Sequence, residues 1–315
     1  MNQRIKKHLL FTTLAVCLLA VVGLPLKSIA ATDNTDKTSL AVSPPTFDLS
    51  ANPGDTLHDS IKVQNITDKT VDINTSIKNF VAVGTEGEVG LTDQNGQYSL
   101  AKWIHVTPSS AVLQAKESKV FNFTVDVPKN AEPGGKFGSI VFSTTHGASG
   151  ASAVGVSQQI GTLLLLRIAG DAKEQASISS MLADHTSQND TVTYKTLISN
   201  EGNVQVKPIG SITITNMFGK KVATIPFGGK YVIPGAKREF INQWQHSGML
   251  IGKYTATLTL LYGTKNMTLT SSVSFISIPW KMLGIILFIA VIIGLMLWKA
   301  RNRLKRAFRI LFEKE

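Results

Sequence analysis

Apolar and polar residues alternate over most of the chain, which indicates β-strands that bury one face. Ile61 and Val63 alternate with polar neighbours, and Phe121 and Phe123 repeat the same period of two. Successive side chains of a strand point to opposite faces, so this period is typical of half-buried strands. Turn signals such as NPGD at 52–55 separate the runs. Short strands divided by turns predict an all-β protein built of antiparallel sandwiches.

The predicted strands form two similar sets. SIKVQNITDKTVDI places a turn at Asn65 between two strands, and YKTLISNEGNVQVKP does the same at Asn200. Later in each set, AKESKVFNF precedes GGKFGSIVF, and AKREFINQW precedes IGKYTATLTL. Two copies of one plan, each of about 100 to 130 residues, fit the usual domain size. We predict two tandem Ig-like sandwiches, at 40–170 and 171–277, with the junction near 170–173.

The strand pattern gives way to the apolar run Met282–Trp298, which contains no charged residue. About 20 apolar residues span a bilayer core, and adding Ile276 to Trp280 brings the run to that length despite Lys281. We predict a transmembrane helix at 278–298. A buried core helix is the alternative, and it is disfavoured because few globular helices are apolar on every face.

A basic segment follows this run and predicts the orientation of the chain. Lys and Arg are enriched on the cytoplasmic side of membrane helices, so the tail at 299–315 is expected inside and the β-domains outside, as in a single-pass type I protein. A helical tail would place apolar and basic residues on different faces and lie against the anionic inner leaflet. The residues expected at the membrane interface are Trp280, Trp298, Lys299, Arg301, Arg303, Lys305, Arg306 and Arg309.

The N-terminus has the pattern of a secretory signal. Basic residues precede an apolar run, and small residues stand before a cleavage site expected at Ala30 or Ala31. We predict a signal peptide at 1–30 and a flexible leader at 31–39. An uncleaved N-terminal anchor is the alternative, and it would leave the β-domains on the same side of the membrane.

The net charge of +11 is high enough to suggest nucleic-acid binding, but the positions of the charged residues along the chain argue against it. Most of the excess lies in the signal region and in the basic tail, so the predicted exported part is nearly neutral. We therefore expect no nucleic-acid partner. The single cysteine, Cys17, lies within the signal, so the exported part is expected to lack disulfides, zinc–thiolate sites and thiol nucleophiles.

No catalytic motif is evident. The histidines occur singly, without HExxH or another metal-binding spacing, and no nucleophile motif is present. We expect no enzyme activity, no metal and no cofactor. Aromatic residues are the better candidates for ligand binding, because exposed rings supply contact area at little entropic cost. The candidates are Phe80, Tyr98, Trp103 and Trp244, and the alternative for each is a place in a sandwich core.

Three stretches of the first predicted domain carry a family resemblance: VSPPTFDLSANPGD from Val42, IKVQNITDKTVDI from Ile61, and VFNFTVDVPKNAEPGGKFGSIVF from Val120. They resemble the first domain of bacterial WxL-interacting proteins, cell-surface proteins of Gram-positive bacteria with two Ig-like domains and a C-terminal membrane helix. The resemblance implies a peptidoglycan-binding domain from Leu40 to Gly170 and a partner-binding second domain, but it marks no individual binding residue.

The sequence therefore predicts a membrane-anchored bacterial surface protein that binds peptidoglycan or another surface protein. The alternative is a membrane-tethered assembly factor like a pilus chaperone, which would lend a strand edge to an exported client. The sequence leaves the ligand and the oligomeric state open.

Overall fold

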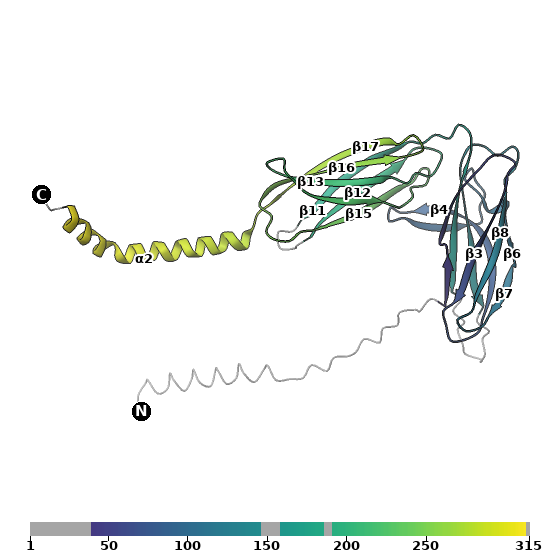
Figure 1. The fold of residues 1–315 in the computed structure, drawn as a ribbon, viewed down its shortest axis with the longest axis horizontal. Helices are drawn as coiled ribbons and strands as arrows, with labels where there is room; N and C mark the ends of the chain where they lie inside the picture. Colours follow the sequence, from purple (N-terminus) through teal and green to yellow (C-terminus); the bar gives the residue numbers. More distant parts are fainter. Residues whose placement is uncertain (1–38, 146–157, 186–190, 313–315) are drawn as a thin grey trace, which may run out of the picture. The chain divides into compact units, whose positions relative to one another are not determined.

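The computed structural model describes residues 39–145, 158–185 and 191–312 (Figure 1). These residues form β-strands, one 3₁₀ helix and one long α-helix, which confirms the all-β class. The first set of strands is β1 Leu40–Ser43, β2 Thr46–Ala51, β3 Thr56–Asn65, β4 Val71–Val83, β5 Glu88–Thr92, β6 Ile104–Thr107, β7 Ser110–Leu113, β8 Ser118–Asp126, β9 Gly134–Thr145 and β10 Gln159–Ile168, with the 3₁₀ helix η1 Ala101–Trp103 before β6. The second set is β11 Ala176–His185, β12 Thr191–Asn200, β13 Ile209–Asn216, β14 Lys221–Gly228, β15 Lys237–Gln245, β16 Gly252–Tyr262 and β17 Met267–Ser277, followed by helix α2 Trp280–Phe312.

The first set of strands makes two sheets around one core, which we call the first sandwich. One sheet has the order β1-β3-β8-β6, and the other has β2-β10-β9-β4-β5 with β7 paired to β4. Alternate residues of both sheets enter the core, where Phe121 meets Phe142 edge-on with ring centroids 5.0 Å apart. Strand β2 lies parallel to β10, whereas the other pairings are antiparallel.

The second set of strands makes the second sandwich, from sheets β11-β12-β15 and β14-β13-β16-β17. Its core is separate from the first and includes Tyr194 and Ile198 from one sheet and Ile212 and Leu258 from the other, all fully buried. The predicted alternation of buried and exposed residues is clearest along β16. Strand β10 ends at Ile168 and β11 begins at Ala176, so the junction expected near 170–173 falls in the segment between them.

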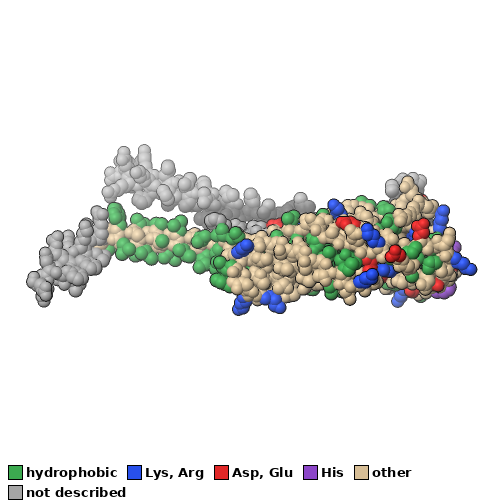
Figure 2. All heavy atoms as spheres, turned by 90° about the horizontal axis from the view of Figure 1, so that it is seen from above, with side chains coloured by type: hydrophobic (Ala, Val, Ile, Leu, Met, Phe, Trp, Pro, Cys, Tyr) green, Lys and Arg blue, Asp and Glu red, His purple; other side chains and the backbone are tan. Residues whose placement is uncertain are grey.

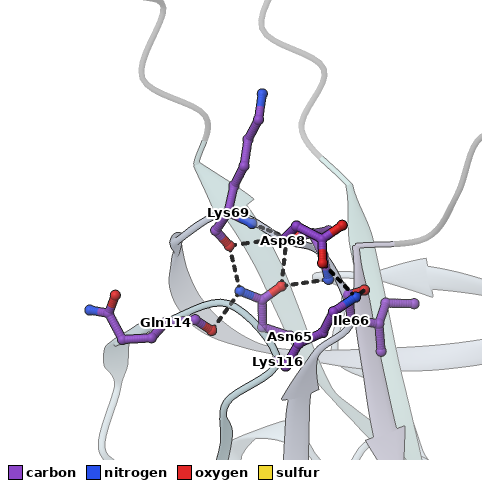
Figure 3. Close-up of polar contacts among 7 residues, drawn as sticks. Asn65, Ile66, Asp68, Lys69, Gln114 and Lys116 are labelled. Carbon is purple, nitrogen blue, oxygen red and sulfur yellow. Dashed lines mark hydrogen bonds and ion pairs between the residues drawn. The ribbon is translucent and has the colours of Figure 1, made fainter.

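The side chain of Asn65 stabilises the turn after β3 through hydrogen bonds, as Figure 3 shows. It is fully buried, and its Nδ2 donates to the carbonyl oxygens of Lys69 at 2.7 Å and Gln114 at 2.8 Å. Lys116, beside this turn, makes an ion pair with Asp68 at 2.9 Å. One buried amide thus joins the β3–β4 connection to the segment between β7 and β8.

Asn200 does the same in the second sandwich. Its Nδ2 donates to the carbonyl oxygens of Val204 and Val232, both at 2.8 Å, and its Oδ1 accepts from the backbone N–H of Gly202 at 2.9 Å. Like Asn65, it stands at the end of a strand, is buried, and bonds to a carbonyl four residues ahead and to a distant loop. The repeat seen in the sequence therefore has a structural counterpart.

Helix α2 follows the second sandwich (Figure 1). Consecutive apolar side chains from Met282 to Trp298 are exposed around it. Among the residues that the structure describes, no helix combines the length and apolar character needed to cross a membrane. The predicted membrane span is thus not confirmed and stays a prediction.

Several sequence-based predictions fall outside the described part of the chain. The cleavage site at Ala30 and Ala31 and most of the leader precede Ser39. Among the interface residues, Trp298 is exposed, whereas the side chains of Trp280, Lys299, Arg301, Arg303, Lys305, Arg306 and Arg309 lie outside the description.

Candidate functional site

The candidate site lies beside β4, where this strand changes partners. The first part of β4 pairs with β7 and β9, and its last residues, from Asn79 to Val83, pair with β5. The chain after β5 returns past β4 as the segment 93–100 before η1 begins. A cavity of about 270 Å³ lies between this segment and β4, and a second of about 250 Å³ adjoins it. Both cavities are lined by Asn79, Thr92 and Asn95.

Asn79 fixes the wall of the cavity. Its side chain is buried, and Nδ2 donates to the carbonyl oxygen of Gln94 at 3.0 Å. Its Oδ1 accepts from the backbone N–H groups of Leu100 at 3.0 Å and Ala101 at 2.9 Å. A buried amide is stable only when hydrogen-bonded, and here its partners are all backbone groups of the returning segment. Asn79 therefore sets the position of residues 94–101 against β4.

Two of the sequence-predicted aromatic residues meet at this cavity. Phe80 and Tyr98 both pack on Phe137, with ring centroids 5.8 Å and 6.0 Å away. The backbone N–H of Phe137 donates to the Tyr98 carbonyl oxygen at 2.7 Å, which fixes the segment on β9. Phe80 is buried, while Tyr98 is half-buried and lines the cavity. Tyr98 is thus the ring that a ligand can reach, and Phe80 supports it through Phe137.

Lys136 connects the third aromatic candidate, Trp103, to this site. Its Nζ donates to the carbonyl oxygen of Gln97 at 2.5 Å and lies 5.8 Å from the centre of the Trp103 ring. Burial lowers the pKa of Lys136, and the negative charge of Glu132 acts in the opposite direction. The half-buried Trp103 ring packs against the core of the first sandwich. Lys136 therefore links this ring to the backbone of the segment 93–100.

Exposed amide side chains surround the cavity. Gln94, Asn95 and Gln97 are exposed, and within the described part of the chain their side chains make no hydrogen bond to protein. Lys78 and Asp93 at the rim form an ion pair at 2.6 Å, and the exposed Lys102 also lines the second cavity. Amides both donate and accept, so the amide side chains of this lining suit a ligand with many hydroxyl and amide groups.

Trp244 lies apart from these residues. It is in the core of the second sandwich, only 9% exposed, and packs near Tyr254 and His246 with ring centroids 6.1 Å and 5.3 Å away. Little of its ring is open to a ligand, so the structure favours the core alternative for this residue.

Sequence reasoning missed the polar residues of the site. It gave no role to Asn79, Gln97 or Lys136. One signal was present, because Asn79 is a polar residue beside Phe80 in a strand and the amide-rich stretch DQNGQY ends at Tyr98. In the described ranges, no three His, Cys, Asp or Glu residues group as a metal site would require.

Comparison with known proteins identifies the domain that holds this cavity. Residues 32–144 match the family model described as "WxL Interacting Protein, peptidoglycan binding domain". The match confirms the resemblance noted in the sequence: the first sandwich carries the domain of WxL-interacting proteins. The matched range includes every residue of the cavity. No curated protein matches the chain.

Solved structures with a similar course of chain include pilus chaperones. The class 5 fimbriae chaperone CfaA is 14% identical, and the match covers 76% of this chain and 99% of the chaperone with a TM-score of 0.38. The YadV chaperone is 8% identical, with 76% and 100% covered and a TM-score of 0.38. The Pseudomonas aeruginosa CupB2 chaperone is 10% identical, with 74% and 98% covered and a TM-score of 0.35. These scores are too low to carry an argument about function.

Proposed function

We propose that the protein is a bacterial cell-surface binding protein and that its first, Ig-like sandwich binds peptidoglycan at the cavity beside Tyr98. The observation that carries the proposal is the coincidence of two facts. The domain matches a peptidoglycan-binding family model, and its largest cavity among those described is lined by amides and a reachable aromatic ring.

The chemistry of the site suits this polymer. Peptidoglycan consists of N-acetylated sugars bearing short peptides, and it presents hydroxyl, acetamido and peptide groups. The side chains of Gln94, Asn95 and Gln97 can donate to and accept from such groups. The half-buried ring of Tyr98 offers a flat apolar face against which a sugar can pack. The buried supports, Asn79 and Phe137, hold these groups in place before a ligand arrives.

A sedimentation assay with purified peptidoglycan tests the proposal. The full chain, kept in mild detergent, should pellet with the polymer, and Tyr98→Ala should weaken binding about five- to tenfold, as expected from losing a ring contact of about 1 kcal/mol. Phe218→Ala is the matched control, because it removes a highly exposed ring from the second sandwich. Equal binding by the Tyr98 variant and the unaltered chain would contradict the proposed site, and no sedimentation at all would contradict the function.

We also propose that Met282–Trp298 anchors the chain in the cell membrane, with the β-domains outside and the basic tail inside. Support comes from the uncharged run and the Lys- and Arg-rich segment after it. Carbonate extraction of membranes checks this directly: an anchored chain stays in the pellet, and replacing Leu287 and Val291 by Lys should release it.

The second sandwich, with no amide-lined cavity of this kind among those described, is proposed to hold a surface partner. An assembly role like that of a pilus chaperone makes a different prediction. It would co-purify one exported client and protect it from proteolysis, whereas a wall-binding protein would not.

A further inference from the structure

Exposed apolar side chains gather at one end of the second sandwich. Met217 and Phe218 lie in the β13–β14 turn, Ile251 precedes β16, and Ile276 is near the end of β17. Strand register places these segments together, because Asn216 of β13 lies opposite Tyr254, and Gly252 lies opposite Ser277. The Met217 sulfur is so close that a Cβ on Gly252 would stand 2.8 Å from it. Three separate segments therefore form one apolar surface, which we call the apolar end.

Phe218 is held outward by a well-defined turn. Its side chain is 85% exposed. The Oδ1 of Asn216 accepts hydrogen bonds from the backbone N–H groups of Phe218 at 3.1 Å and Lys220 at 3.0 Å. Gly219, at φ 75°, completes the turn with a backbone bond to the Asn216 carbonyl oxygen at 2.9 Å. A large ring fixed in water by an ordered turn, rather than folded onto the sandwich, is typical of a contact residue.

The charges beside the apolar end are mostly positive. Lys220 and Lys221 follow Phe218 after Gly219, and Lys253 follows Gly252; all three lysines are exposed. Among the described residues, β11 carries an exposed carboxylate, Asp184, one residue before its end. Basic side chains around exposed apolar ones fit an anionic lipid surface, where the lysines are attracted to the phosphates and the apolar groups enter the headgroup boundary.

The apolar end is also where the chain passes into α2. Ser277, opposite Gly252, is followed two residues later by Pro279, and the helix begins at Trp280. A linker that short spans at most about 10 Å, so the helix must start close to the apolar end. Figure 2 shows hydrophobic side chains along the helix.

We propose that the apolar end is a membrane-docking surface: Phe218 and its apolar neighbours enter the headgroup region of an anionic bilayer while Lys220, Lys221 and Lys253 contact its phosphates. The proposal goes beyond peptidoglycan binding, which concerns the first sandwich, and it rests on the membrane location proposed for α2. Docking fixes the second sandwich on the bilayer, so the domain does not swing freely on its linker.

Site-specific fluorescence tests the docking. The single cysteine lies at position 17, so Cys17→Ser allows one label to be placed at a chosen site in the full chain. The chain is reconstituted in vesicles of phosphatidylglycerol and phosphatidylcholine that contain a lipid with a quencher at the top of its acyl chain. An environment-sensitive dye is attached at Phe218→Cys, at Ile209→Cys or at Leu287→Cys. Ile209 is the matched control, because it is exposed and begins β13, at the end of that strand away from the turn that holds Phe218.

We expect lipid quenching of the dye at 218 to exceed that at 209 at least threefold, and the dye at 287 to report whether α2 lies in the bilayer. Lys220→Glu with Lys221→Glu should reduce quenching at 218 to the level at 209, and so should vesicles of phosphatidylcholine alone.

Three results would overturn the docking. Quenching at 287 with equal quenching at 218 and 209 would support the membrane anchor and contradict the docking. Quenching at neither 287 nor 218 would contradict both proposals. In the third result, lipid does not quench the dye at 218, but the dye is protected from aqueous iodide, and this protection increases with protein concentration. The apolar end would then bind a second copy of the chain instead of lipid.

Discussion

The side chain of Asn79 holds the backbone of Leu100: Asn79 Oδ1 accepts a hydrogen bond from the Leu100 N–H at 3.0 Å. Asn79 is in β4, and Leu100 ends the segment that lines the candidate site. Both residues are buried, so this bond couples the stability of the first sandwich to the shape of the cavity.

Replacing Asn79 by Ala should therefore impair both properties. The change leaves the buried N–H of Leu100 without its acceptor, which costs about 1–3 kcal/mol, and it releases residues 94–101 from β4. Urea denaturation and peptidoglycan sedimentation measure the two effects. Asn95→Ala is the control, because this exposed residue should affect binding and leave stability unchanged. A variant of Asn79 with full binding would show that the segment is held by other contacts.

Asn65 and Asn200 should behave alike because they occupy equivalent turns. Asn65→Ala removes hydrogen bonds from a buried amide to three carbonyl oxygens, and Asn200→Ala removes hydrogen bonds to two. We expect each to lower the free energy of unfolding of its own sandwich by about 1–3 kcal/mol. Hydrogen exchange of the full chain locates the effect: faster exchange confined to the sandwich without the substitution would contradict the equivalence.

Glu174 should make stability depend on pH. Burial by itself would raise its pKa, but hydrogen bonds from Arg167 and Thr264 outweigh burial, so the pKa of Glu174 lies below its ordinary value of 4.5. A lowered carboxyl pKa stabilises the folded state above the unfolded pKa, and this contribution is lost as pH falls from about 4.5 through the folded pKa.

Glu174→Gln tests this effect in a pH series of thermal melts. The variant should be less stable than the unaltered chain at pH 7, and the difference should shrink as pH drops below 4.5. Glu201→Gln provides a comparison at a more exposed carboxylate. A constant difference between Glu174→Gln and the unaltered chain at every pH would mean that the charge of Glu174 does not contribute.

Gly210 in β13 should not accept a side chain. A Cβ there would stand 2.0 Å from the carbonyl oxygen of Thr259 in the neighbouring strand. Gly210→Ala must therefore displace backbone, at a cost of about 1–3 kcal/mol or more. Gly96→Ala is the control, because nothing lies within 4 Å of its Cβ. Chemical denaturation compares the two, and an unchanged stability for Gly210→Ala would require that β13 and β16 separate without cost.

The sequence by itself determined the strands, their repetition and the kind of surface each face presents. Period two at residues such as Ile61 and Phe121 records which side chains avoid water, and the residues around Asn65 and Asn200 have the composition of turns. These features depend on near neighbours in the chain, so they can be predicted without the fold. The same pattern left open whether Trp244 or Tyr98 could contact a ligand. The alternation of apolar and polar residues predicts which face of a strand a side chain is on, but it does not predict which other residues cover that face.

Only the tertiary structure decided which of these rings is buried and which lines a cavity. Phe80 and Tyr98 meet because β9 brings Phe137 between them, and Asn79 acquires its role because the chain after β5 returns beside β4. Likewise, the parallel pairing of β2 with β10 joins segments over 100 residues apart. Such contacts form when distant strands pair around a common core. Many residues contribute to the free energy of that packing, so it cannot be predicted from any short stretch of sequence.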